Sequence, residues 1–386
     1  MTPDLEKQFM LREIAMQADF VADNLREMME GVRERLRDFG GRSFSKGYVI
    51  GCGDSYFASL AVRDFMTRAT GRDVEPVESL EFSRYLVNGL RPESFVLGVS
   101  NSGTVSRTIE GIRLARGKGA WTLAVTVSAE NTLARTAETL IKVNAVPNIK
   151  EQADGTRIVT PGTLTYTASL LGLFVAAIGI GELNGHLDPA ASVALLAELA
   201  GVAAKMRAAD APARAVAAEV AKTFTRDRQF VIAGGGPNFA TAHFGAAKWL
   251  EALTKASHPA QLEEWAHIQY FMTDETVDTV LLLPPGAGRD RGLEQARAAR
   301  DMGGRVIIVA ADDDAESQAA ADIFFPMPTG IAEDLTPFVY KVVPEYLSCH
   351  VAMEQGRSFF GFDDPKRQEV NFRQIFHSSQ KAQAKA

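Results

Sequence analysis

The sequence has 386 residues, which suits two domains of moderate size, and its 46% hydrophobic and 23% charged residues are the balance of a soluble globular protein. The formal net charge of −7 argues against nucleic acid as the main partner. Two cysteines, Cys52 and Cys349, cannot make a disulfide framework, which favours a reducing, cytoplasmic location.

The chain opens with residues 4–38, which are charged throughout and place apolar side chains at helical spacing. This segment predicts one long helix and not a signal peptide, which needs an uninterrupted apolar core. The most apolar run, LLGLFVAAIGIG at 170–181, is shorter than the roughly 20 residues that a membrane span needs. We therefore expect a buried helix there and no association with a membrane.

Beyond the first helix, continuous apolar runs alternate with amphipathic stretches. This alternation predicts parallel sheets with helices on both faces, and the pattern occurs twice. We expect an N-terminal helix at 1–39, α/β domains at 40–185 and 186–350, and a tail at 351–386. The predicted strands are 47–53, 73–78, 94–100, 121–127, 139–145, 229–236, 278–285, 305–311 and 321–328, with helices such as 55–70, 106–119, 187–224 and 241–257 between them.

Two glycine-containing turns follow predicted strands of the first domain, GCGDS at 51–55 and SNSGT at 100–104. Backbone N–H groups at such a strand-to-helix turn favour an anion. The first turn is no dinucleotide fingerprint, because Tyr56 stands where G-x-G-x-x-G requires its third glycine. The hydroxyl and amide side chains of the second turn can wrap an oxyanion or a sugar, or they can cap the next helix.

These turns, in GCGDSY and SNSGTVSRTIEGIRLARGKG, resemble those of sugar isomerase (SIS) domains. QFMLREIAMQADFVADNL is similar to the helix that opens the isomerase half of glucosamine-6-phosphate synthase, and ADGTRIVTPGTLTYTASLLGL to the segment joining its two SIS domains. The resemblance covers nearly the whole chain and implies two flavodoxin-like, doubly wound SIS domains in tandem. Residue 2 is Thr and not a nucleophilic Cys, so ammonia transfer from glutamine is not expected.

The candidate catalytic residues lie in AAKWLEALTKASHPAQLEEWAHIQYF, 246–271. Lys248 and Glu251 share one face of a predicted helix, which alone is typical of a surface ion pair, and a lone His267 is more often structural. In the isomerase half of the synthase, and in Amadori-product deglycases of the same superfamily, a Glu on this helix is followed sixteen positions later by a His. Glu251 and His267 reproduce that spacing.

The resemblance implies that Glu251 moves a proton between C1 and C2 of an open-chain sugar. It also implies that His267 opens the ring, or protonates the sugar oxygen, and is donated across a homodimer interface. A partly buried carboxylate base and an imidazole that titrates near pH 7 suit these steps. We expect Lys248 to lower the charge penalty on Glu251 or to steer an anionic group, and Glu264 to orient His267 or to contact a substrate amine. No metal and no cofactor are expected.

The sequence departs from phosphosugar enzymes of this family at four places. Asp54 replaces a Thr or Ser, Val105 a phosphate-contacting Thr, and Gly162 a Ser, so each change removes a hydroxyl donor. At ~4 Å the added charge of Asp54 would oppose a phosphate by about 1–4 kcal/mol, unless Asp54 caps the following helix. In the tail, Val370 stands in place of a ring-opening, Schiff-base Lys, and Lys366 is out of register.

These departures favour an Amadori-product deglycase, which releases an aldose and an amino acid from a fructosyl-amino acid, possibly unphosphorylated, and needs no such Lys. The alternative is an aldose–ketose (phospho)sugar isomerase, and a non-catalytic sugar sensor is less favoured because the chain lacks a basic recognition segment. Arg84 and Arg157 are candidates to bind the amino-acid carboxylate, or else form ion pairs. The other candidate substrate-binding residues are Gly53, Asp54, Ser55, Ser100, Asn101, Ser102, Thr104 and Thr160.

Overall fold

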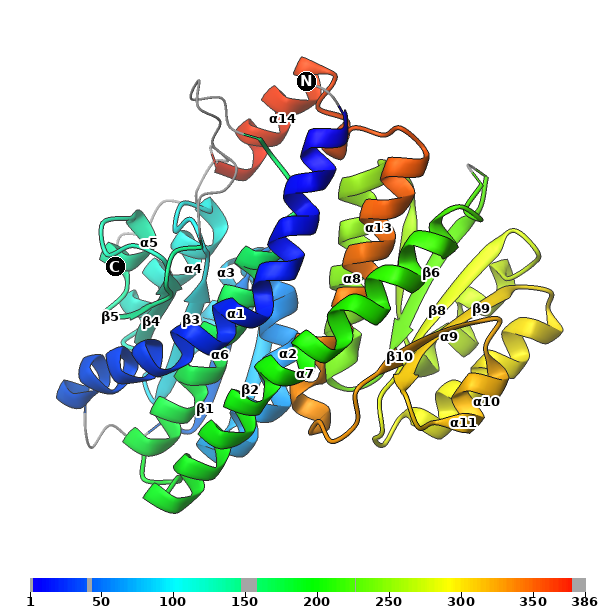
Figure 1. The fold of residues 1–386 in the computed structure, drawn as a ribbon. Helices are drawn as coiled ribbons and strands as arrows, with labels where there is room; N and C mark the ends of the chain where they lie inside the picture. The colour runs from blue at the N-terminus through cyan, green and yellow to red at the C-terminus, as the bar shows by residue number, and fades with distance from the viewer. Residues whose placement is uncertain (1–2, 40–43, 147–157, 226, 377–386) are drawn as a thin grey trace. The chain divides into compact units, whose positions relative to one another are not determined.

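A computed structural model describes residues 3–39, 44–146, 158–225 and 227–376 of the chain (Figure 1). The chain divides into two compact units, each of which contains one parallel sheet. We call them the first-sheet unit and the second-sheet unit, and we describe each by itself. The first-sheet unit comprises Phe20–Val146, Thr165–Ala200 and Lys366–Ala386, and the second-sheet unit comprises Met1–Asp19, Pro147–Leu164 and Gly201–Pro365.

The first-sheet unit has five parallel strands in the order β2-β1-β3-β4-β5, the flavodoxin-like doubly wound order that the sequence predicts. Its central strands β3 and β4 are buried along their whole length, as expected for apolar runs covered by helices on both faces. The elements are β1 Lys46–Gly51, α2 Asp54–Thr70, β2 Asp73–Glu78, α3 Ser79–Arg84, the 3₁₀-helix η2 Leu86–Gly89, β3 Ser94–Val99, α4 Ser106–Gly117, β4 Trp121–Thr126, α5 Thr132–Thr136 and β5 Thr139–Lys142.

The second-sheet unit repeats this topology, with the order β7-β6-β8-β9-β10. One of its strands, β7 Ser257–Gln261, is absent from the sequence prediction because SHPAQ contains no apolar run. The other elements are β6 Gln229–Gly234, α8 Pro237–Leu253, α9 Leu262–His267, η3 Gln269–Met272, β8 Val277–Leu283, α10 Arg289–Asp301, β9 Arg305–Ala311, α11 Ala315–Ala320, β10 Ile323–Met327, η4 Glu333–Leu335, α12 Thr336–Tyr340 and α13 Val342–Glu354.

The repeat is nearly free of insertions in its first three strands and their helices. Gln229 opens β6 183 residues after Lys46 opens β1, and the same interval separates the starts of α2 and α8, η2 and η3, β3 and β8, α4 and α10, and α5 and α11. The edge strands β2 and β7 even carry a proline at matching places, Pro76 and Pro259. An edge strand tolerates a proline because the missing N–H would face away from the sheet.

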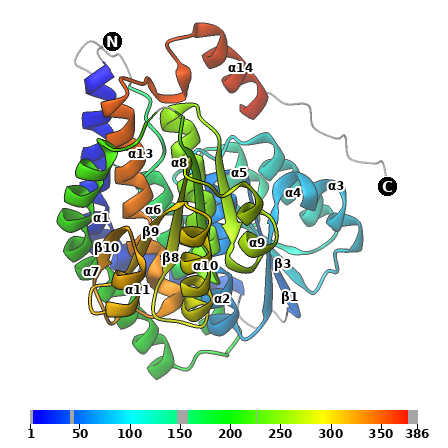
Figure 2. The ribbon, with the colours of Figure 1, turned by 90° about the vertical axis from the view of Figure 1, so that its right-hand side faces the viewer.

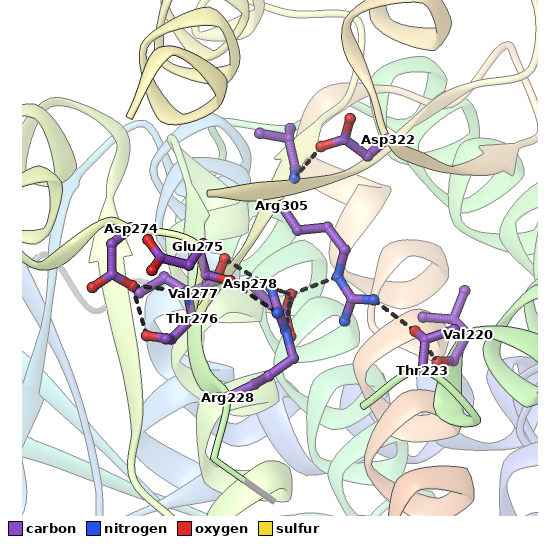
Figure 3. A network of polar contacts seen from close by, with 11 residues as sticks. Val220, Thr223, Arg228, Asp274, Glu275, Thr276, Val277, Asp278, Arg305 and Asp322 are labelled. Carbon is purple, nitrogen blue, oxygen red and sulfur yellow. Dashed lines mark hydrogen bonds and ion pairs between the residues drawn. The ribbon is translucent and has the colours of Figure 1, made fainter. Parts of the chain in front are cut away.

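A buried carboxylate ties the strands of the second sheet together where β8 and β9 begin (Figure 3). Asp278 is fully buried and accepts from Arg228 Nε at 2.8 Å and from Arg305 Nε at 2.6 Å. Arg305 also donates to Thr223 Oγ1 at 2.6 Å. The two guanidinium groups offset the cost of burying this charge, which would otherwise be several kcal/mol.

Three long helices accompany the sheets: α1 Pro3–Leu36, α6 Leu164–Leu183 and α7 Pro189–Ala221. By length and composition alone, α6 and α7 could cross a membrane. The most apolar window of α6 is 94% buried inside the protein, which confirms the prediction of a buried helix, although the helix is longer than the apolar run suggests. The most apolar window of α7 is 33% buried. The core helix of a soluble protein can meet the same criteria of length and composition. The chain also forms the short helix α14 Pro365–Phe376.

Candidate functional site

The loop after β3 carries the hydroxyl groups that the sequence singles out. Ser100 Oγ accepts the N–H of Gly103 at 3.1 Å, and Ser102 Oγ lies 2.9 Å from Thr104 Oγ1. The N-cap of α4 is Val105, whose side chain forms no cap hydrogen bond. None of the four polar residues of the motif is therefore the N-cap residue of α4. Asn101, the remaining residue of the motif, accepts the hydroxyl of Thr126 through its backbone carbonyl at 3.1 Å.

The turn after β1 places a carboxylate at the start of α2. Gly53 is the N-cap, with the left-handed φ of 54° that glycine tolerates, and Asp54 is the first helical residue. Asp54 is therefore not the N-cap residue of this helix. A Cβ added to Gly53 would meet no atom within 4 Å. Ser55 follows in the first turn of α2 and is half-buried.

Cys52 lies between Gly51 and Gly53 in this turn and is not suited to nucleophilic catalysis. Its Sγ lies 3.2 Å from Glu78 Oε1, and burial raises the pKa of the thiol to about 11. The thiol therefore stays protonated at neutral pH, whereas the nucleophile would be the thiolate.

Two arginines of the first-sheet unit, Arg84 and Arg107, share the buried carboxylate of Glu110. Arg84, at the end of α3, lies 3.1 Å from Glu110 Oε1, and Arg107, in the first turn of α4, lies 2.5 Å from Glu110 Oε2. Glu110 is fully buried, whereas Arg84 and Arg107 expose 25% and 15% of their side chains. The cluster has two positive charges and one negative charge. The sequence analysis identified Arg84 but missed Arg107, whose only sign was its position three residues before Glu110.

The matching turn of the second-sheet unit is different, because a carboxylate of the protein fills it. The loop after β8 reads PPGAG (284–288), and the N–H of Ala287 donates to Glu333 Oε2 at 3.4 Å. A Cβ at Gly286 would come within 2.2 Å of the Glu333 carboxyl carbon. This turn therefore offers few hydroxyl donors, and its anion position is taken by Glu333.

Lys248 and Glu251 lie at the end of α8 in the second-sheet unit. The Lys248 side chain is fully buried, and its Nζ donates to Glu251 Oε2 at 2.5 Å. Glu251 exposes 28% of its side chain. The ammonium also lies 5.0 Å from the centre of the Phe244 ring. The pair is therefore not the ordinary surface pair that its spacing alone suggests, since one partner belongs to the core.

His267 closes α9 and is largely exposed, with 66% of its side chain accessible. Its Nε2 lies 3.4 Å from Glu263 Oε1, and Glu263 also accepts from Arg291 Nε at 2.8 Å. The contact therefore involves Glu263, whereas Glu264, which we expected to orient His267, is an exposed neighbour. Glu251 precedes β7 and His267 follows it, so the two belong to different elements. Donation of His267 across a dimer interface stays a prediction.

Three further residues that the sequence analysis names are Thr160, Arg157 and Val370. Thr160 is buried and donates to Glu13 Oε2 at 2.8 Å, inside the second-sheet unit. Arg157 lies outside the described residues. Val370 lies in α14 with 37% of its surface exposed. Among the described residues, no group of three or more His, Cys, Asp or Glu could hold a metal ion.

Residues 45–171, which include both turns and most of the first-sheet unit, match the family model of the SIS domain. These residues of the chain therefore form a SIS domain. The second sheet has the same strand order as the first, which agrees with two SIS domains in tandem.

Relatives of known name support this assignment. The chain is 26% identical over 354 residues to glutamine–fructose-6-phosphate aminotransferase (isomerizing) of Gloeobacter violaceus, covering 91% of this chain and 56% of that protein. The enzyme of the same name from Methanothermobacter thermautotrophicus is 28% identical, with 90% and 55% covered. The chain thus spans little more than half the length of these relatives.

Solved structures show the same fold. The C-terminal domain of glucosamine-fructose-6-phosphate aminotransferase from Francisella tularensis superposes with a TM-score of 0.79 at 18% identity, over 91% of this chain and 97% of that one. Tagatose-6-phosphate ketose/aldose isomerase from Escherichia coli superposes with a TM-score of 0.65 at 13% identity, over 92% and 93%. At these identities the likeness concerns the fold. This likeness therefore establishes the fold, and it does not confirm the deglycase prediction.

Proposed function

We propose that this protein is an aldose–ketose isomerase that transfers a proton between C1 and C2 of an open-chain sugar or sugar phosphate. The observation that carries the proposal is the Lys248–Glu251 pair, in which a partly exposed carboxylate contacts a fully buried ammonium at 2.5 Å. An opposite charge at this distance favours the ionised form of a carboxylate, which is the form that accepts a proton. Two SIS-fold neighbours, one of them named a ketose/aldose isomerase, add support.

In this mechanism Glu251 removes the proton from C2 of the aldose, the electron pair forms the C1–C2 double bond, and the carbonyl oxygen O1 takes up a proton from water to give an enediol. Glu251 then returns its proton to C1 while the hydroxyl on C2 loses its proton to water, which gives the ketose, and the reverse sequence gives the aldose. His267 donates a proton to the ring oxygen as the cyclic sugar opens, a role for which an exposed imidazole is suited. Lys248 keeps Glu251 charged between turnovers.

The first-sheet unit has a candidate sugar-binding loop of its own. The hydroxyls of Ser100, Ser102 and Thr104, with the N–H groups of the two turns, hydrogen-bond the hydroxyls of the sugar or its anionic end. We further propose a homodimer in which His267 serves the partner's site. Ile268 and Phe271, which expose 56% and 75% of their surface beside His267, are apolar residues that an interface would cover.

A second candidate, the Amadori-product deglycase, uses the same proton transfer. Glu251 would remove a C1 proton to give an enaminol, protonation at C2 would give an imine, and water would release the aldose and the amino acid. The Arg84–Glu110–Arg107 cluster favours this candidate, because the partly exposed guanidinium group of Arg84 suits the carboxylate of an amino acid. Val370, in place of a Schiff-base Lys, points the same way.

The two candidates differ in their products. The protein is incubated with free aldoses, aldose 6-phosphates, and fructosyl-amino acids with and without a 6-phosphate, and NMR detects either an isomer or a free amino acid. Glu251→Gln should lower turnover by about 10²–10⁴-fold. Glu219→Gln, at the exposed Glu219–Lys222 pair of α7, is the matched control and should change nothing. Undiminished turnover in Glu251→Gln would remove Glu251 as the base.

A further inference from the structure

A pocket of about 180 Å³ lies among helices α1, α7, α12 and α13, within the second-sheet unit. Figure 1 and Figure 2 show α1, α7 and α13 side by side. Asp19, on α1, accepts from Arg207 Nη2, on α7, at 2.7 Å. Asp210, also on α7, accepts from the hydroxyl of Tyr346, on α13, at 2.5 Å. These contacts hold the walls of the pocket together, and neither proposed catalytic residue lines it.

The inner wall of the pocket is apolar. It consists of six buried side chains, those of Ile14, Ala18, Met206, Phe338, Val339 and Val342. The amide of Gln17 also lines the pocket, but it is used at both ends, because Nε2 donates to buried Glu345 at 3.0 Å and Oε1 accepts from buried Lys341. An apolar cavity of about 150 Å³ is large enough to bind benzene. The wall therefore suits a branched aliphatic or phenyl side chain.

The rim of the pocket is charged and accessible. Arg207 and Asp19 expose 52% and 65% of their side chains. Arg207 uses Nε and Nη2 to contact Asp19, and its Nη1 has no hydrogen-bond partner among the described residues. Asp210 accepts the hydroxyl of Tyr346 through Oδ1 alone, so its Oδ2 is left without a donor in the described part of the chain. One donor and one acceptor therefore remain for a ligand.

We propose that this pocket binds a free α-amino acid with an apolar side chain. Arg207 and Asp210 are three residues apart on α7 and so share one helix face. They can therefore contact two groups that are bound to one carbon atom. The guanidinium of Arg207 holds the carboxylate of the amino acid, Asp210 accepts from its ammonium, and its side chain enters the apolar wall. The rim carries charges of both signs, which suits a zwitterion. This inference does not depend on the proposed isomerase activity.

The test measures binding by NMR at the pocket itself. The ¹³C-labelled methyl group of Met206 is the reporter, and its resonance is identified by its absence in Met206→Leu. Leucine is compared with 3-methylbutylamine, which lacks its carboxylate, with 4-methylpentanoate, which lacks its ammonium, and with glycine, which lacks its side chain. We expect leucine to bind at least about 10-fold more tightly than each of these probes, because each has lost one of three contacts. No shift of the Met206 methyl up to about 20 mM leucine, or a probe that binds as tightly as leucine, would overturn the inference.

Two variants assign the contacts. Arg207→Gln should weaken leucine binding at least about 10-fold and leave 3-methylbutylamine unchanged. Asp210→Asn should weaken leucine binding by a similar factor and spare 4-methylpentanoate. Equal losses for leucine and the probe in either variant would contradict the assignment.

A third variant fills the pocket from its rim. Ala15 is exposed and lines the pocket, so Ala15→Phe should abolish leucine binding without disturbing the core. Ala22→Phe is the matched control, at an exposed alanine of α1 that does not line the pocket, and it should bind leucine normally. Leucine binding that persists in Ala15→Phe would show that the amino acid binds elsewhere.

Discussion

The two sheets of this protein have one backbone plan but differ in the side chains that complete it. Where β3 and β4 begin, Phe95 pairs with Trp121, and Phe44 packs against both rings at 5.0 and 6.2 Å. At the matching place in the second sheet, Asp278 pairs with Arg305. An aromatic cluster and an ion cluster thus occupy equivalent positions. The strand order is the same in the two sheets, whereas the side chains that pack at this place are aromatic in one and charged in the other.

The turns that follow β3 and β8 also differ between the two repeats, and this difference bears on function. The turn after β3 keeps its hydroxyl groups, whereas the matching turn after β8 has lost them and holds the carboxylate of Glu333. The catalytic candidates Lys248 and Glu251 lie in the second repeat, where their counterparts in the first are Phe65 and Arg68. The two repeats have therefore taken different tasks in our proposal, binding in the first and proton transfer in the second.

The largest effect is expected at the ion cluster. Asp278→Asn should lower the free energy of unfolding by about 3–5 kcal/mol, because it leaves two arginines beside a neutral group. Urea denaturation followed by circular dichroism measures the change. Glu294→Gln, at the exposed pair with Arg291, is the control and should change stability by less than about 0.5 kcal/mol. An equally small effect of Asp278→Asn would show that the ion cluster does not stabilise the second sheet.

Double substitutions should show that Gly103 is required for its backbone conformation and Gly286 only for lack of space. Gly103 has a φ of 66° and its added Cβ would meet the Asn131 side chain, whereas Gly286 is crowded by Glu333 and has no positive φ. Gly103→Ala should therefore cost about 1–2 kcal/mol even when Asn131→Ala removes the crowding. Gly286→Ala should be largely rescued by Glu333→Ala. Rescue of both, or of neither, in denaturation experiments would contradict this distinction.

The sequence predicts the repeated fold well because the central strands are continuous apolar runs. It misses β7, whose edge position needs little apolar surface and tolerates Pro259. It also begins the helix after β6 at residue 241, whereas α8 begins at Pro237, since proline suits a first helical turn.

For the candidate site, sequence comparison finds the polar turns and the Glu251–His267 spacing. It does not find Arg107, or the pair that Lys341 and Glu345 form at α13 with both side chains fully buried and 3.2 Å between Nζ and Oε1. In a sequence these are Arg/Glu or Lys/Glu pairs three or four apart, which are typical of an exposed helix face. Only burial distinguishes them, and burial depends on which helix packs against which. The same limit explains why Glu264 was expected next to His267 although Glu263 makes the contact.

A smaller effect is expected at the arginine pair of the first repeat. Arg107→Gln should raise KM for a fructosyl-amino acid about 10-fold relative to its effect on a free ketose, because one charged hydrogen bond to the carboxylate is lost. Arg116→Gln, near the end of α4, is the matched control. Equal changes for both substrates would assign the pair to structure alone and would weaken the deglycase candidate.

The smallest predicted effect concerns the matching caps of α5 and α11, Asn131 and Asp314. The Arg289 guanidinium holds the pKa of Asp314 well below its usual range, so its stabilising contribution is present above about pH 4 and is lost as the pH falls. Asp314→Asn should therefore cost about 1 kcal/mol at pH 7 and much less at pH 2–3. The reciprocal Asn131→Asp should add acid sensitivity to the first repeat. Thermal unfolding at several pH values tests both, and a pH-independent effect of Asp314→Asn would contradict the assignment.

The central claim is that Glu251 exchanges a proton with the sugar, and solvent exchange measures that step directly. A ketose or fructosyl-amino acid that the protein turns over is incubated with it in D₂O, and ¹H NMR follows the loss of the C1 proton. We predict exchange with the native protein and a loss of about 10²–10⁴-fold with Glu251→Gln. Exchange at an undiminished rate in that variant would show that another group moves the proton.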